Sequence, residues 1–144
     1  MKYKVSIDIN KPIEHVTRLF KDRTNDKLWM KGFKAKTPIE GHEGEEGARC
    51  KVEFQLGKRY FAMEEEILKI DLPDEYITTY TTPKVFNVVK NSFEKIDDNS
   101  TRYSTEQDFQ FKGIMKIMAF FMPGAFKKQS MSYLKDFKTF AEKQ

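Results

Sequence analysis

The last quarter of the chain, residues 112–144, reads KGIMKIMAFFMPGAFKKQSMSYLKDFKTFAEKQ. From Ala125 onward, apolar residues recur every three to five positions, as they do in a helix that packs one face on a core. These residues are Phe126, Met131, Leu134, Phe137, Phe140 and Ala141, and the opposite face is mostly lysine. The spacing predicts a long C-terminal helix around which the rest of the chain is organised.

The segment before Pro123 is apolar on nearly every side, because only Lys116 interrupts residues 113–122. Three interpretations fit it: a helix buried between a sheet and a second surface, a lid whose flexible methionines line an apolar cavity, or a contact with a dimer partner or a membrane. A spanning helix is excluded, since the run of about 14 residues is shorter than the ~20 that a bilayer requires. Pro123 predicts a break in the helix, and we expect mobility to concentrate before it.

Length and cysteine content set broad limits. A chain of 144 residues is expected to form a single domain, residues 1–144, with a core large enough to need no metal or disulfide. The one cysteine, Cys50, has no partner for an internal disulfide. Because no charged and then apolar leader follows Met1, we expect a cytoplasmic protein.

The basic excess of the chain is concentrated at its end. The formal net charge is +4, and residues 112–144 hold seven lysines against Asp136 and Glu142. A lysine-rich helix with an apolar start can rest on an anionic membrane, but solvated lysines on the outer face of a packed helix are the commoner cause. Nucleic acid is not expected as a partner, because this segment lacks arginine and no strand interleaves basic and aromatic residues.

The rest of the chain is dominated by the two-residue alternation of strands. We expect strands over residues 2–9, 33–39, 50–56, 59–71, 76–82, 85–96 and 100–111, with helical stretches over 13–21 and 25–30. Strands in succession closed by a terminal helix predict an α+β fold.

Polar residues interrupt the predicted inward face of the last two strands. Gln107 and Thr105 alternate in step with Tyr103 and Phe109, and Asn91 lies in step with apolar neighbours on the preceding strand. A buried amide costs about 1–3 kcal/mol unless it is paired. These side chains are therefore expected to contact each other, water or a ligand.

The whole chain resembles the START-like, or SRPBCC, superfamily. The resemblance lies in VSIDINKPIEHV (5–16), in residues 19–22 leading to Trp29, in the glycine-rich loop 40–48, and in residues 109–112 that enter the final helix. It implies a helix-grip fold, in which a curved antiparallel sheet of about six or seven strands wraps a long C-terminal helix and encloses a ligand cavity. Members bind lipids, sterols, polyketides, quinones or plant hormones, and the polyketide cyclase/dehydratase-like group is the most similar. Because fold does not fix function, the resemblance does not choose among these.

The leading hypothesis is a non-catalytic module that binds a hydrophobic or amphipathic small molecule, such as a lipid or polyketide, between the sheet and the C-terminal helix. Tyr80, Asn91 and Gln107 are expected to orient the polar end of the ligand. The full set of predicted ligand-binding residues is Trp29, Phe54, Tyr80, Asn91, Gln107, Phe109, Met118, Met122, Phe126 and Phe137.

A cyclase or dehydratase is the alternative, with Glu64, Glu66 and Tyr80 as candidate catalytic residues. In a strand, either Glu65 or the pair Glu64 and Glu66 must face the concave side. The pair alternates in step with Tyr60, Ala62, Leu68 and Ile70, and we therefore expect it to border the cavity near an open end. Apolar walls there would raise the pKa of a carboxylate toward that of a general base. An exposed acidic patch is the simpler interpretation of the same residues. A third hypothesis makes residues 113–126 a dimer or membrane contact, so that the protein is a monomer or a homodimer.

Metal and cofactor sites are not expected. His15 and His42 have no ligand spacing. Cys50 alternates with charged residues, as a small core residue does on the inner face of a strand.

Overall fold

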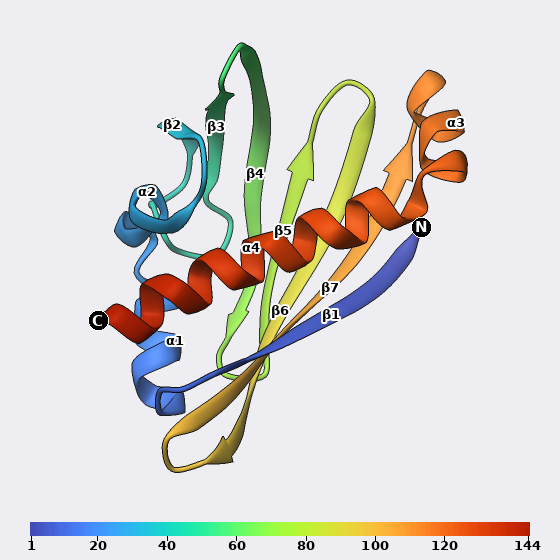
Figure 1. The fold of residues 1–144 in the computed structure, drawn as a ribbon. Helices are drawn as coiled ribbons and strands as arrows, with labels where there is room; N and C mark the ends of the chain where they lie inside the picture. Colours follow the sequence, from blue (N-terminus) through green and yellow to red (C-terminus); the bar gives the residue numbers. More distant parts are fainter.

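The computed structural model describes residues 1–144 and contains one antiparallel sheet with a long helix across one of its faces (Figure 1). The strands are β1 (Lys2–Ile9), β2 (Phe33–Glu40), β3 (Arg49–Leu56), β4 (Arg59–Asp71), β5 (Glu75–Thr81), β6 (Val85–Asp97) and β7 (Ser100–Phe111). The helices are α1 (Ile13–Lys21), the 3-10 turn η1 (Arg23–Asn25), α2 (Asp26–Trp29), α3 (Ile114–Phe121) and α4 (Pro123–Lys143). The predicted α+β fold with a long C-terminal helix is confirmed.

The sheet brings the two ends of the chain together. Its strand order is β1-β7-β6-β5-β4-β3-β2, so the first strand pairs with the last. Helix α4 then lies over β1: the Tyr3 hydroxyl donates to the carbonyl oxygen of Phe126 (2.9 Å), and Lys138 Nζ donates to the carbonyl oxygen of Asp8 (2.7 Å). These bonds fix the position of α4 along the sheet.

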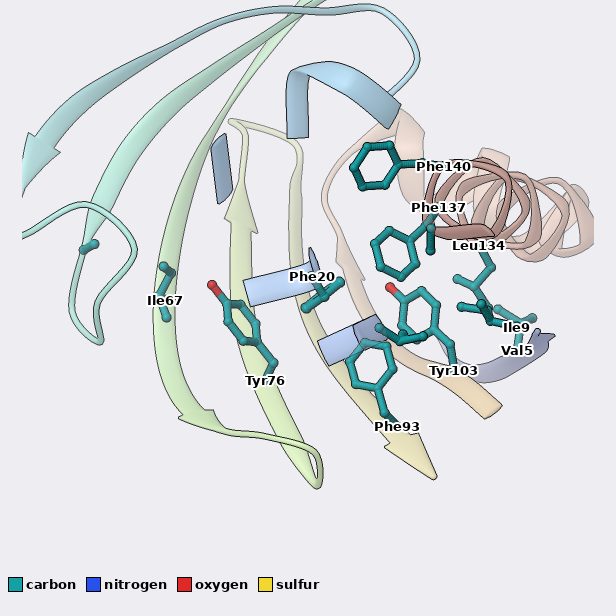
Figure 2. Packing of buried hydrophobic residues seen from close by; sticks show 13 residues of the cluster. Val5, Ile9, Phe20, Ile67, Tyr76, Phe93, Tyr103, Leu134, Phe137 and Phe140 are labelled. Atoms are coloured by element: carbon teal, nitrogen blue, oxygen red, sulfur yellow. The ribbon is translucent and has the colours of Figure 1, made fainter. Parts of the chain in front are cut away.

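The core lies under the C-terminal half of α4, whose apolar stripe is buried there as predicted (Figure 2). Phe20 of α1 is at its centre, with edge-on contacts to the rings of Tyr76, Phe93, Tyr103 and Phe137 at centroid distances of 5.1–5.7 Å. Aromatic pairs in this geometry add to the stabilisation that burial provides. This end of the space between helix and sheet is therefore filled by side chains.

Pro123 separates two helices. Met122 leaves the helical region of backbone space (φ −130°, ψ 51°), and Pro123 occupies the first turn of α4, where its missing N–H is not needed. The break predicted at Pro123 is confirmed. Whether residues 113–122 are more mobile than α4 stays a prediction, which hydrogen exchange can check.

The packing predicts that two phenylalanines of the C-terminal segment contribute very differently to the free energy of unfolding. Phe137 is fully buried, whereas Phe120 is 80% exposed. We expect Phe137→Ala to lower the free energy of unfolding by about 3–5 kcal/mol through lost burial and a residual cavity. Phe120→Ala should change it by no more than about 0.5 kcal/mol. Urea unfolding followed by circular dichroism measures both, and equal losses would contradict the proposed core.

Candidate functional site

A cavity of about 290 Å³ lies between the sheet and the N-terminal half of α4, next to the aromatic core. Helix α4 contributes Phe126, Ser130 and Tyr133 to its lining, whereas Phe137 one turn further on packs in the core. Most of the lining side chains are hydrophobic, among them Trp29, the only tryptophan of the chain. Cavities of this character are typical of small-molecule sites.

A row of polar side chains crosses the floor of the cavity. Glu65 of β4 is the register partner of Tyr80 on β5, which is in turn the partner of Asn87 on β6, and all three line the cavity. Register partners on one face of a sheet have adjacent side chains. The row therefore runs across the sheet, perpendicular to the strands.

Two buried carboxylates and two largely buried cations form one cluster at the Glu65 end of this row. Arg23 Nη2 lies 2.7 Å from Glu65 Oε2, and Arg23 Nε lies 2.7 Å from Asp26 Oδ2. Lys36 Nζ is 3.7 Å from Glu65 and 3.9 Å from Asp26. The Arg23 guanidinium also donates to the Tyr76 hydroxyl at 3.1 Å. Two cations face two carboxylates, so the cluster carries no net charge.

The surroundings set the protonation of the groups in the row. Burial alone would raise the pKa of Glu65, but Arg23 and Lys36 outweigh it and lower that pKa. Burial raises the pKa of Tyr80 well above its ordinary value, and the neighbouring Glu65 charge adds to the rise. Burial, followed by Glu65, raises the pKa of Cys50 to about 11. At neutral pH the row therefore holds a carboxylate beside a neutral phenol, and Cys50 is an unreactive thiol.

Two buried polar atoms of the cavity wall have no hydrogen-bond partner: Thr78 Oγ1 and Asn87 Oδ1. Thr78 is 2% exposed and Asn87 8%. The other end of the Asn87 amide is satisfied, because Nδ2 donates to Gln107 Oε1 at 2.8 Å. Unsatisfied buried polar atoms are rare in proteins, and at a cavity wall they indicate a place for a polar group of a ligand.

The other amides of the last two strands are also hydrogen-bonded. Gln107 Nε2 donates to Thr105 Oγ1 at 2.9 Å, which is one of the three outcomes expected for these side chains. Asn91 Oδ1 instead accepts from the Tyr103 hydroxyl at 2.9 Å, a partner that was not predicted.

The structure brings most of the predicted ligand-binding residues to the cavity. Those that line it are Trp29, Phe54, Tyr80, Asn91, Gln107, Phe109 and Phe126. That they contact a ligand stays a prediction.

Three predicted lining residues lie elsewhere. Phe137 is fully buried in the core, and Met118 and Met122 are 47% and 55% exposed at the surface. Helix α3 is therefore neither buried between two layers nor a lid whose methionines line the cavity, since only its Ala119 is buried. An all-round apolar segment contains no periodicity that tells which face packs, and for this reason the prediction for Met118 and Met122 was wrong.

Glu64 and Glu66 do not border the cavity, and this prediction was also wrong. The cavity face of β4 is formed by Phe61, Met63 and Glu65. Glu64 points to the other face, where it pairs with Arg49. A bulge between Ile67 and Lys69 shifts the alternation by one residue, so Ile70 packs against the core although it is even-numbered. The assignment was inverted for two reasons: Ile70 lies beyond the bulge, and Tyr60 and Ala62, which were predicted to face inward, lie on the outer face with Glu64.

The charged cluster itself was missed by sequence reasoning. Arg23 lies in the 3-10 turn after α1, Asp26 begins α2, and Lys36 lies in a strand rich in lysine. No feature of the neighbouring sequence distinguishes these three charged residues from solvent-exposed ones. The only signal is the middle glutamate of Glu64-Glu65-Glu66, which must face opposite to its neighbours in a strand.

None of the helices is long and apolar enough to cross a bilayer, and no group of side chains is arranged to hold a metal ion.

Comparison with known proteins identifies the fold. No protein-family model and no curated protein matches the sequence. Solved structures do match: a START superfamily protein from Mycobacterium smegmatis superposes with a TM-score of 0.76 at 11% identity, covering 99% of this chain and 97% of that one. The chain has the START-like helix-grip fold.

Two enzymes share this helix-grip fold. The Zhui aromatase/cyclase from Streptomyces sp. R1128 has a TM-score of 0.80 at 11% identity, with 99% of this chain and 93% of that chain covered. Norcoclaurine synthase from Thalictrum flavum, in complex with dopamine and hydroxybenzaldehyde, has a TM-score of 0.77 at 8% identity, with coverages of 100% and 87%. At these identities the likeness extends to the fold alone.

The neighbouring glutamates of β4 offer a matched pair of substitutions. Glu65→Gln leaves the buried Arg23 and Lys36 facing Asp26 alone, and breaking a buried ion pair in this way costs about 3–5 kcal/mol. Glu64→Gln removes a charge from the outer face and should change the free energy of unfolding little. If the two variants unfold at the same urea concentration, Glu65 is not part of a buried cluster.

The stability difference should also depend on pH. Because the pKa of Glu65 is lowered in the folded state, its charge stabilises the fold above its ordinary pKa of 4.5, and this contribution is lost as the pH falls through the folded-state pKa. The gap in unfolding free energy between wild type and Glu65→Gln is therefore expected to narrow below pH 4.5. A gap that stays constant from pH 7 to pH 3 would contradict the assignment.

Proposed function

We propose that this helix-grip protein binds a neutral, largely apolar small molecule that carries at least one hydroxyl or N–H group, and that it does so without chemical turnover. The observation that supports this most directly is the pair of unpartnered atoms, Thr78 Oγ1 and Asn87 Oδ1, in the wall of an otherwise apolar cavity. Asn87 Oδ1 can only accept a hydrogen bond, so the ligand supplies a donor.

The balance of charge supports a neutral ligand. The charges of Arg23, Lys36, Asp26 and Glu65 compensate one another within 4 Å. A charged group brought into the cavity would find no free counter-charge and would lose its hydration. A hydroxylated aromatic, a polyketide or an uncharged lipid fits this requirement.

The two enzymes of the same fold support a hydroxylated aromatic ligand, although dopamine, unlike the ligand proposed for this chain, carries an ammonium charge. One is named an aromatase/cyclase, and the other was solved with dopamine and hydroxybenzaldehyde, both small aromatic molecules with hydroxyl groups. At 8–11% identity, the support is an analogy between the cavities of proteins that share a fold.

A cyclase or dehydratase remains the second candidate, because Glu65 and Tyr80 stand side by side in the cavity wall. The protonation states favour binding over this activity. Glu65 is held by Arg23 and its pKa is lowered, which makes it a weak base, and Tyr80, whose pKa is raised, keeps its proton. An enzyme of this kind would lose turnover, with unchanged binding, in the variant Tyr80→Phe.

The single tryptophan gives a direct binding assay. Trp29 lines the cavity, so a neutral fluorophore with an N–H group, N-phenyl-1-naphthylamine, should quench its emission saturably. In competition, 2-naphthol is expected to bind at least about tenfold more tightly than either naphthalene or 2-naphthoate, since one lacks the donor and the other carries a charge. Absence of saturable quenching, together with no adduct in native mass spectrometry of the purified protein, would overturn the proposal.

Two adjacent threonines test the role of the unpartnered hydroxyl. Thr78→Val removes Oγ1 from the cavity wall at nearly constant volume, and we expect it to weaken 2-naphthol binding about fivefold to tenfold while leaving naphthalene unchanged. Thr79→Val is the matched control, because Thr79 is equally buried but does not line the cavity. Equal affinities for 2-naphthol in the two variants would show that the hydroxyl does not contact the ligand.

A further inference from the structure

Helix α3 exposes more apolar surface than any other part of the chain. Together with Met122 it holds six of the eleven exposed large hydrophobic residues of the protein, and these six side chains are 47–80% exposed. These six are Ile114, Ile117, Met118, Phe120, Phe121 and Met122. Apolar side chains gathered in this way mark an interaction surface more often than a solvated one.

The helix projects away from the rest of the fold. Figure 1 shows α3 at the end of β7, near the N-terminus of the chain. Gly113 (φ 61°) and the non-helical Met122 separate it from β7 and from α4. The chain therefore presents α3 at one end of the molecule, where Ala119 is buried and most of the large apolar side chains stay uncovered.

Lysines without acidic partners surround this apolar helix. Lys112, Lys116, Lys127 and Lys128 belong to a stretch that contains no aspartate or glutamate before Asp136. Lys84 joins them, because its carbonyl oxygen accepts the backbone N–H of Lys112 at 2.9 Å. All five are exposed and none forms an ion pair, so their charges are not compensated within the protein. Asp108, the nearest acidic residue along β7, pairs with Lys2 at 3.8 Å.

From this combination we infer that α3 docks on an anionic lipid surface, with Phe120 and Phe121 inserted among the acyl chains and the five lysines facing the headgroups. Short helices that lie in the interface of a membrane combine an apolar face with flanking basic residues in this way. Unpaired lysines near an anionic surface each strengthen binding about fivefold.

A second copy of the chain fits the same surface less well. A two-fold symmetric contact through α3 would bring its five lysines against the same five lysines of the partner, with no acidic residue in the patch to compensate. Like charges brought together across an interface oppose association. An anionic membrane provides both the apolar layer and the missing negative charge.

The surface is continuous with the cavity, although the inference does not depend on the proposed ligand. Phe111, at the end of β7 next to α3, stacks on Phe109 at a centroid distance of 5.4 Å, and Phe126 contacts both rings. Phe109 and Phe126 line the cavity. A protein docked through α3 would thus hold one aromatic wall of its cavity next to the lipid surface.

Vesicle flotation tests the inference with the full chain. We expect binding to phosphatidylcholine vesicles containing 30% phosphatidylserine to be at least about tenfold tighter than binding to pure phosphatidylcholine, and to weaken when NaCl is raised from 50 to 300 mM. No binding to either vesicle, or equal binding to both, would overturn it.

Variants separate the apolar and electrostatic contributions. Phe120→Ser/Phe121→Ser should lose at least about tenfold in affinity for the vesicles, whereas Leu28→Ser/Leu68→Ser, a pair exposed elsewhere, should bind as wild type does.

Charge-reversal variants test the electrostatic contribution. Lys127→Glu/Lys128→Glu should lose at least about 25-fold in affinity for the vesicles. Lys51→Glu/Lys58→Glu makes the same change in net charge elsewhere and should lose much less. Circular dichroism confirms that each variant is folded. Unchanged binding by the α3 variants would overturn the inference, as would a dimer in light scattering that Phe120→Ser/Phe121→Ser dissolves.

Discussion

The cavity exists because α4 packs closely on the sheet along only half of its length. Phe20 and Phe137 fill the space under its C-terminal half with interlocking aromatic rings. Under the N-terminal half, helix and sheet are joined at the edge, by the bonds from Tyr3 to Phe126 and Ser130, while the middle stays open. Close packing at one end and hydrogen bonds at the other hold the helix at a fixed height, so the space beneath it is a built feature of the fold.

The charged cluster lies at the Glu65 end of the polar row in the cavity wall, and the energetics of buried ion pairs indicate what role it plays. Arg23 ties the segment between α1 and α2 to Glu65 on β4. A buried ion pair of this kind seldom stabilises a protein more than apolar side chains of the same volume would. The cluster is better understood as a polar end of the cavity that carries no net charge, which restricts what can bind beside it. The same pairing holds Glu65 ionised and Tyr80 protonated at neutral pH.

Much of the fold could be predicted because it depends on local periodicity. The stripe of α4 and the alternation of β6 and β7 are each set by residues within one element. The errors arose where burial depends on partners distant in sequence. On β4, the bulge after Ile67 shifts the alternation, and the aromatic Tyr60 lies on the outer face, so the inward face could not be assigned from the strand alone. The pairing of Arg23 with Glu65 spans 42 residues. For α3, the apolar composition predicted that its side chains contact another surface. It did not tell whether that surface belongs to the same chain.

The structure departs from ordinary folding rules in two places, and in both a group lacks the partner that it would normally have within the chain. Buried polar atoms normally find partners and large apolar side chains are normally covered, yet Thr78 and Asn87 break the first rule and Phe120 and Phe121 the second. Neither departure strains the core, where the packing around Phe20 is complete. The unpartnered polar atoms lie in the cavity wall, and most of the exposed large apolar side chains lie on one helix. A ligand and a surface can supply the missing contacts at these two places.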